Sequence, residues 1–280
     1  MALLIAKADG TQEPFNPEKL VASLMRAGAD HGLARTITDD IAKELYAGIT
    51  TQEIYRHAFS RLREARRGAA ARYSLKRAIL EFGPSGFPFE AYLAELFRAE
   101  GAKAKVDQIV QGACVEHEVD VVVHKGKEVT FVEAKFHNAA GFKTDLKVAL
   151  YVKARLDDIA AARKAKGVEE PMRGLLVTNT KFTDKVAQYA ACAGVDLLGW
   201  EEPDGATLHD RIDRAQLYPI TALTSLGRRE KMALLSQKIV LCTSLAEDAG
   251  ALGAAGVQGS KAERVLEEAS ALCMPVKRIK

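Results

Sequence analysis

Asp120, Glu133 and Lys135 place two carboxylates and an ammonium group close together in the sequence. Alternation along a strand places Glu133 and Lys135 on one face, with Ala134 pointing to the other. Pairing across a short turn can bring Asp120 beside Glu133. Two carboxylates that converge next to a lysine on rigid strands can hold Mg²⁺ and place an ammonium group near its bound water.

A β-hairpin is the element that must position these residues. Residues 119–123 are rich in valine, residues 125–127 form a polar turn centred on glycine, and residues 129–136 begin a second β-rich run. Glu-x-Lys alone is common, and most copies lie on the solvated face of an edge strand. Here apolar residues surround the charges and a predicted helix precedes the hairpin, which favours a metal-dependent site.

Asp120, followed one hairpin later by Glu133-Ala134-Lys135, resembles the Asp…(Asp/Glu)-x-Lys signature of the restriction-endonuclease-like nucleases, in particular the Mrr-like and archaeal Holliday-junction-resolvase branches. The resemblance implies that Asp120 and Glu133 bind Mg²⁺ with help from the Ala134 carbonyl. It also implies that Lys135 orients or activates the attacking water. Glu90, in the helix before the hairpin, is the candidate for a further acidic metal ligand of that family.

Length and composition limit the class of protein. A chain of 280 residues, 48% hydrophobic and 28% charged, is long enough for two or three globular domains. No apolar run approaches the length that spans a membrane, and the start lacks the pattern of a signal peptide. The four cysteines are scattered and form no Cys-x-x-Cys pair, so we expect a cytoplasmic protein without disulfides or zinc. The formal charge of +3 is too small to indicate nucleic-acid binding by itself.

Residues 1–83 are predicted to form a small, mostly helical domain. Asn16 is a plausible N-cap, because Pro17 follows it at the first position of a helix. Threonines mark the starts of the next helices, and Gly83-Pro84 ends the last one. The expected elements are a strand at 3–7 and helices at 17–29, from Thr38, from Thr50 or Thr51, and at 69–82.

This domain resembles the ATP-cone, the nucleotide-sensing domain at the front of many ribonucleotide reductases. The matching segments are Lys7-Ala8-Asp9-Gly10, Phe15 with Lys19, residues 49–54, and Ala71-Arg72-Tyr73. The resemblance implies that Lys7 and Lys19 pair with phosphates of ATP or dATP and that Thr51 lies near the base. Ala8 replaces a basic residue common in that family. The alternative is a small helical domain whose lysines are solvated.

Residues 84–205 are predicted to form a second domain, which opens after a linker dense in glycine and proline. The predicted order is helix, three strands, helix, strand, helix, strand. It favours a mixed sheet with helices on both faces, and it matches the element order of the restriction-endonuclease-like core. The later elements are expected at 145–165, 174–179, 183–193 and 195–200.

Residues 206–280 are predicted to form a third, helical domain. A helix is expected at 229–241, a tight glycine turn at 252–257 and a further helix at 260–272. This pattern resembles a helix-hairpin-helix, which implies that Lys261 grips a DNA phosphate beside the turn amides. A bundle that serves domain contacts or dimerisation is an equal alternative.

Together these features predict an α+β multidomain protein with an ATP-cone, a mixed-sheet α/β nuclease core and a small helical domain. The expected function is Mg²⁺-dependent DNA cleavage of restriction, defence or repair type, with ATP or dATP as effector. We expect a homodimer, since cutting two strands suits two sites related by a two-fold axis. The alternative is a nucleotide-responsive DNA-binding regulator with an inactive nuclease core.

Overall fold

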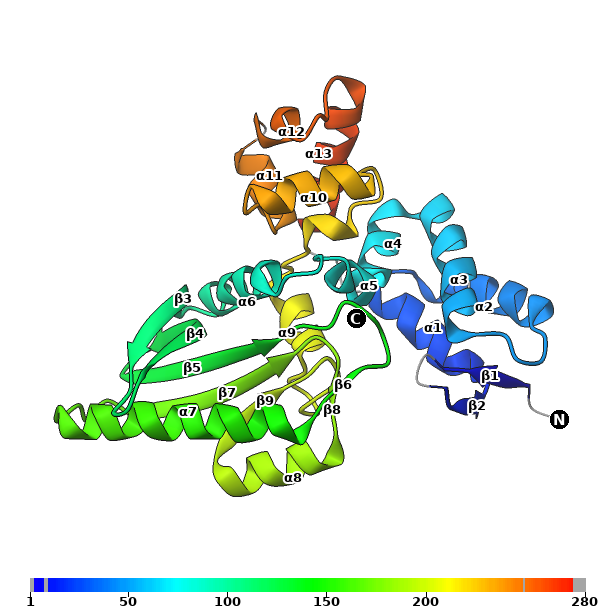
Figure 1. Ribbon diagram of the computed structural model, residues 1–280. Coiled ribbons are helices and arrows are strands. Elements are labelled where there is room, and N and C mark those ends of the chain that lie inside the picture. Colours follow the sequence, from blue (N-terminus) through cyan, green and yellow to red (C-terminus); the bar gives the residue numbers. More distant parts are fainter. Residues whose placement is uncertain (1–2, 8–9, 249, 274–280) are drawn as a thin grey trace. The chain divides into compact units, whose positions relative to one another are not determined.

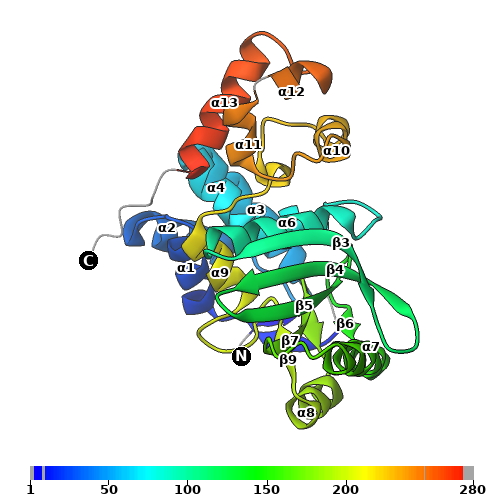
Figure 2. The same cartoon turned by 90° about the vertical axis from the view of Figure 1, so that its left-hand side faces the viewer.

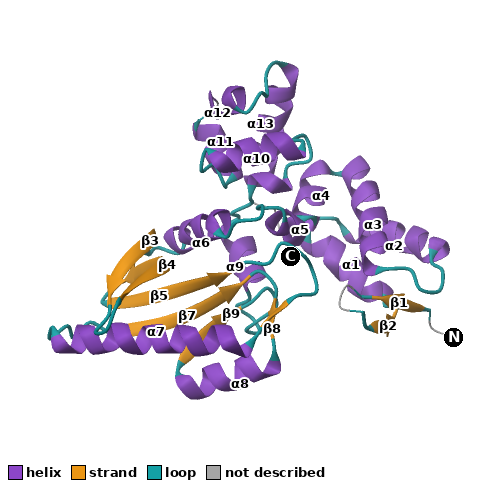
Figure 3. Ribbon diagram, in the orientation of Figure 1, coloured by secondary structure: helices purple, strands orange, loops and turns teal. Residues whose placement is uncertain are grey.

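The chain folds into two compact units (Figure 1). The structure is a computed structural model that describes residues 3–7, 10–248 and 250–273. One unit comprises Met1–Glu81 together with Tyr218–Lys280, and the other comprises Phe82–Leu217. Helices and a mixed sheet occur together, so the predicted α+β multidomain class is confirmed (Figure 3). Within the described residues, no helix has both the length and the apolar character that a membrane span requires.

A five-stranded sheet forms the centre of the unit Phe82–Leu217. Its strand order is β3-β4-β5-β7-β9. The first three strands are antiparallel neighbours, whereas β5, β7 and β9 run parallel, so the predicted mixed sheet is confirmed. The strands are β3 (Lys103–Gln111), β4 (Glu116–Lys125), β5 (Glu128–Lys135), β7 (Met172–Thr178) and β9 (Val195–Leu198).

Helices cover both faces of this sheet (Figures 1 and 2). On one face the long helix α7 packs Leu156 and its neighbours against Phe131 in a buried cluster. Gly174 permits this contact, because a Cβ atom there would lie 2.0 Å from Leu156 Cδ1. On the other face Phe89 of α6 meets Phe136, with 5.8 Å between the ring centroids. The helices of this unit are α6 (Phe87–Ala99), α7 (Leu146–Ala165), α8 (Asp184–Ala193) and α9 (Leu208–Ala215), and the two-residue strands β6 (Lys143–Thr144) and β8 (Lys181–Phe182) pair in parallel.

The N-terminal part of the other unit has the capping residues that the sequence predicted. Asn16 accepts hydrogen bonds from two backbone N–H groups of α1, and Thr50 forms a capping box with Glu53 at the start of α3. The elements here are β1 (Leu4–Ala6), β2 (Gln12–Pro14), α1 (Pro17–Arg26), α2 (His31–Glu44), α3 (Thr51–Ala65), α4 (Arg67–Tyr73) and α5 (Leu75–Leu80).

Two helix predictions in this part were wrong. The second helix begins at His31 rather than Thr38, because Asp30 caps it through the Leu33 N–H, and Thr38 is buried inside it. The helix expected at 69–82 is two short helices. The break falls at Ser74, whose hydroxyl donates to the Ala71 carbonyl, 2.8 Å away.

The C-terminal segment is helical, but its breaks differ from the prediction. The helix expected at 229–241 ends at Ser236, because the chain turns at Lys238, which has a left-handed φ of 63°. Part of the expected turn at 252–257 is helix α12, so the turn begins after Ala254. The elements are η1 (Ile220–Ala222), α10 (Arg228–Ser236), α11 (Cys242–Glu247), α12 (Gly250–Ala254) and α13 (Ser260–Cys273).

Contacts group the chain into two units, in place of the three successive domains 1–83, 84–205 and 206–280 that the sequence predicts. Helix α9 lies in the unit with the central sheet, whereas Tyr218 and the residues after it group with the N-terminal part. Helix α13 contacts α4, and η1 contacts α5. The first and last segments of the chain therefore pack against each other.

Candidate active site

The β4–β5 hairpin brings Asp120 and Glu133 together. Lys125 pairs with Glu128 across a tight turn, and Val121 pairs with Val132 further along. In that register Asp120 comes opposite the end of β5, where its Oδ2 accepts a hydrogen bond from the Ala134 N–H at 2.7 Å. The strand pairing alone thus fixes the first carboxylate beside the Glu-x-Lys segment.

Helix α7 holds the second carboxylate. Tyr151 donates its hydroxyl proton to Glu133 Oε1 at 2.5 Å, and Arg155 pairs with Oε2 of the same carboxylate. Tyr151 and Arg155 are four residues apart, so they share one face of the helix, and the guanidinium lies 5.6 Å from the centre of the tyrosine ring. The Glu133 side chain is only 13% exposed. Both of its oxygens therefore have fixed partners.

Tyr151 is a site residue that sequence reasoning missed. Its position on the helix after the hairpin, one turn before Arg155, is the available signal. Only the packing of α7 on the sheet shows that this helix face meets Glu133.

The acidic side chains form one electrostatic cluster. Burial and the charge of Glu133 raise the pKa of Asp120 to about 6. Burial and nearby carboxylates, Asp120 first among them, raise the pKa of Glu90 on α6 to about 7. The structure thus brings Glu90, Asp120 and Glu133 close enough for their charges to oppose one another. Such a site favours the entry of a cation.

Lys135 is the last residue of β5, two residues after Glu133. It pairs with Thr178 of β7, and its carbonyl accepts a hydrogen bond from the Thr178 hydroxyl at 2.8 Å. The Asn179 amide then holds the backbone of His137 through two hydrogen bonds, of 2.8 and 2.7 Å. Among the described residues no carboxylate forms an ion pair with Lys135, so its charge remains available for a substrate.

The oxygen donors of this site fit Mg²⁺ that is shared with a substrate. Within the described ranges, no three His, Cys, Asp or Glu side chains are grouped closely enough to hold a metal ion by themselves. Mg²⁺ in phosphoryl-transfer sites is commonly held by one or two carboxylates, with water and substrate phosphate completing the shell. Asp120 and Glu133 supply two such carboxylates. The metal roles of Ala134 and Glu90 stay predictions.

The predicted nucleotide-binding residues lie in the N-terminal part. Lys19 and Thr51 line a pocket of about 180 Å³, which Tyr55 and Tyr73 also line. Lys7 and Lys19 both pair with Glu13, at 2.7 and 3.5 Å. The structure thus gathers the three predicted residues around one pocket and one carboxylate. Ala8 lies outside the described residues.

Lys261 has a partner inside its own unit. Its ammonium group lies 2.6 and 2.7 Å from the two carboxylate oxygens of Glu230 on α10. A DNA phosphate would have to compete with this carboxylate. The role of Lys261 in DNA binding, and the helix-hairpin-helix assignment, stay predictions.

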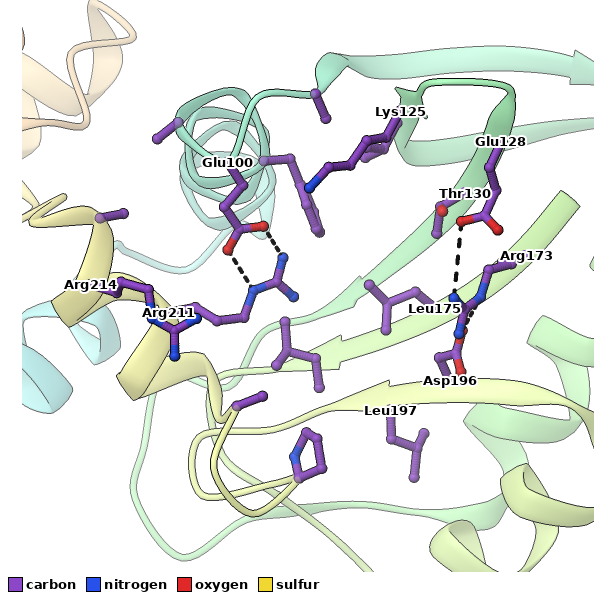
Figure 4. Close-up of a pocket in the computed structure, with 18 residues that line it drawn as sticks. Glu100, Lys125, Glu128, Thr130, Arg173, Leu175, Asp196, Leu197, Arg211 and Arg214 are labelled. Carbon is purple, nitrogen blue, oxygen red and sulfur yellow. Dashed lines mark hydrogen bonds and ion pairs between the residues drawn. The ribbon is translucent and has the colours of Figure 1, made fainter. Parts of the chain in front are cut away.

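A larger pocket, of about 730 Å³, lies over the sheet between α6 and α9 (Figure 4). Glu100 pairs with Arg211 through two hydrogen bonds, and Asp196 pairs with Arg173 at 2.7 Å. Figure 4 shows that Glu100 points toward Arg211 and that Asp196 points toward Arg173. None of the predicted catalytic residues lines this pocket, and most of its charges neutralise one another.

Three family models match successive parts of the chain. They are the ATP cone domain at residues 3–80, a restriction endonuclease domain at 84–210, and the AF1548-like C-terminal domain at 218–273. The two resemblances drawn from the sequence, to the ATP-cone and to the Mrr-like nucleases, are thereby confirmed. The fold and the matched domain define the class: this is a protein with a restriction-endonuclease domain. That domain supports the assignment of the protein as a nuclease.

An uncharacterized protein of Archaeoglobus fulgidus is 35% identical over 179 residues, which are 63% of this chain and 97% of that protein. The crystal structure of AF1548, a protein of unknown function, matches with 31% identity and a TM-score of 0.56, over 68% of this chain and 98% of that one. The chain belongs to the AF1548-like family. The MspJI restriction endonuclease bound to a 27-mer oligonucleotide matches at a TM-score of 0.33 and 16% identity, over 71% of this chain and 39% of that one. That overlap is too low to support an argument.

Proposed function

We propose that this protein is a Mg²⁺-dependent DNA endonuclease of restriction or repair type, with ATP or dATP as its effector. The observation that carries the proposal is that Asp120 and Glu133 lie together at the end of one hairpin, with Lys135 two residues further along the same strand, inside a restriction-endonuclease domain. Two carboxylates and a nearby ammonium group are the groups that phosphodiester hydrolysis needs.

Each side chain has a distinct role in this proposal. Asp120 and Glu133 hold Mg²⁺, which stabilises charge on a phosphate and lowers the pKa of water. The Lys135 ammonium group orients the attacking water and stabilises the charge that develops on the phosphate oxygens. Tyr151 and Arg155 fix the direction of the Glu133 carboxylate. A carboxylate held in this way loses little freedom when a cation arrives.

The nucleotide binds in the pocket of the ATP-cone that Lys19 and Thr51 line. Lys7 and Lys19 bind its phosphates, and Thr51 lies near its base. Nucleotide changes the rate of cleavage or the assembly state only if it binds one state of the protein better than the other. A homodimer, with one site for each DNA strand, is part of the same proposal.

Cleavage of supercoiled plasmid in the presence of Mg²⁺ tests the proposal. We expect nicking by the wild type that EDTA stops, and a rate lower by about 100-fold or more for Glu133→Gln. Glu128→Gln is the matched control, because Glu128 begins the same strand and lies away from Asp120. Addition of ATP or dATP should change the wild-type rate.

If the protein retards DNA in a gel but cleaves none at any metal or nucleotide concentration, the proposed endonuclease activity is wrong. That outcome would favour the DNA-binding regulator with an inactive core.

A further inference from the structure

The short helix α4 contacts both the nucleotide pocket and the C-terminal helices. Tyr73, its last residue, lines the pocket. Arg72, the residue before it, donates from Nη2 to the carbonyls of Ala271 and Leu272 in α13, at 3.2 and 3.4 Å. The same guanidinium lies 5.8 Å from the centre of the Tyr218 ring. Adjacent residues of one helix therefore face two different domains.

The Arg72 contact is the kind that holds a helix end in place. The last carbonyl groups of a helix have no partner within the helix, and they form the negative end of its dipole. A guanidinium group that donates to these carbonyls gives them hydrogen-bond partners and places a positive charge at the negative end of the dipole. Here the Arg72 guanidinium reaches the last turn of α13. Loss of this contact would loosen the end of α13.

The pocket is too small for a nucleotide as it stands. Its volume of about 180 Å³ is below the roughly 300–1,000 Å³ of most ligand pockets. Several of its walls, including Ile5, Leu20 and Ile54, belong to the buried core and cannot move far. A nucleotide that enters the pocket fully would therefore have to displace a side chain outside the fully buried core, such as one of the partly buried side chains that pack against it.

Tyr73 is the wall best placed to move. Its ring stacks on Tyr55, with 5.2 Å between centroids and 6° between planes. A nucleobase can replace one ring of such a stack, because stacking on an aromatic face tolerates any base. Tyr55 lies inside the 15-residue helix α3, whereas Tyr73 ends a helix of 7 residues, beside the break at Ser74. The lower cost of displacement thus falls on Tyr73.

We propose that nucleotide entry displaces Tyr73, withdraws Arg72 from the carbonyls of α13, and so loosens the AF1548-like C-terminal domain from the ATP-cone. This inference rests on the nucleotide binding proposed above. Because coupling between two equilibria is reciprocal, a docked α13 also opposes nucleotide binding. The partner controlled by the nucleotide is thus the chain's own C-terminal helical domain.

Hydrogen exchange measured by mass spectrometry on the full-length protein tests this coupling. With saturating ATP, we expect amides in residues 265–273 of α13 to exchange about fivefold faster or more, and those of α7 to be unchanged. In Arg72→Gln the fast exchange should be present without ATP, and ATP should bind about fivefold more tightly. Arg67→Gln is the matched control, because Arg67 is an exposed residue of the same helix.

Calorimetric titration of the same samples with ATP separates the two proposals. ATP binding with unchanged exchange in α13, or with slower exchange, would overturn the coupling and leave nucleotide binding standing. No heat of ATP binding at millimolar concentration would overturn both. The comparison of wild type with and without ATP decides the question even if Arg72→Gln folds poorly.

Discussion

At the residue scale, Asp120 carries a charge that its surroundings disfavour. Burial and the charge of Glu133 raise its pKa from 3.8 to about 6. A carboxyl whose pKa is higher in the folded state than in the unfolded state binds protons better when folded. The free energy of unfolding therefore falls as the pH rises from about 4 to about 6, and the cost persists at neutral pH.

Replacement of Asp120 by Asn should remove this cost. We expect Asp120→Asn to raise the free energy of unfolding at pH 8 by about 1–2 kcal/mol and to abolish cleavage. The gain should shrink as the pH falls from 6 to 4 and below, because the wild-type carboxyl becomes protonated first in the folded state and, only below about pH 4, in the unfolded state as well. Urea denaturation in EDTA, at several pH values, measures it. An Asn variant that is less stable than the wild type at pH 8 would show that the surroundings of Asp120 do not disfavour its charge.

The residues of the hairpin were predictable, because side chains on paired strands follow a period of two and a short turn fixes the register. The sequence therefore predicted Asp120 beside Glu133, with Lys135 two residues on. Tyr151 was not predicted as a partner of Glu133, since its contact depends on how α7 packs on the sheet. Contacts between distant elements leave no periodic pattern in the sequence.

At the element scale, the loop after β5 depends on β7. The Asn179 side chain is 1% exposed and binds both the N–H and the carbonyl of His137. These bonds continue the β5–β7 ladder past Lys135 and Thr178, where backbone pairing stops. The backbone of Lys135 is thus held by the β5–β7 pairing before it and by the Asn179–His137 hydrogen bonds after it.

Asn179→Ala should leave two half-buried backbone groups of His137 without their partners. We expect a loss of about 2 kcal/mol in the free energy of unfolding and a lower rate of cleavage. Asn138→Ala is the control, because Asn138 is exposed in the same region. Equal stabilities of the two variants in urea would show that the amide does not hold the loop.

Element boundaries show where sequence reasoning fails. Asn16 and Thr50 were predictable as caps, because their side chains bind nearby backbone groups. The break at Ser74 and the turn at Lys238 were not, since helical periodicity continues through both. Tertiary packing overrides local propensity at such positions.

At the scale of the whole molecule, the three matched domains do not form three separate units. The C-terminal segment groups with the ATP-cone, although more than a hundred residues separate them in the chain. The sequence predicted the kinds of domain in their order, but pairing between the first and the last requires the folded chain. In the proposed coupling, a nucleotide bound to the first domain would act on the third domain through this contact.

The rate of plasmid nicking by Lys135→Ala, compared with that of Lys127→Ala, tests whether the end of the β4–β5 hairpin is a nuclease site. Lys127 lies in the turn at the other end of the same hairpin and is exposed. If Lys135 stabilises the developing charge, its variant should lose about 100-fold or more in rate at saturating Mg²⁺, while Lys127→Ala keeps the wild-type rate. Equal rates for Lys135→Ala and the wild type would show that Lys135 takes no part in cleavage, and the cleavage would then have to come from another site.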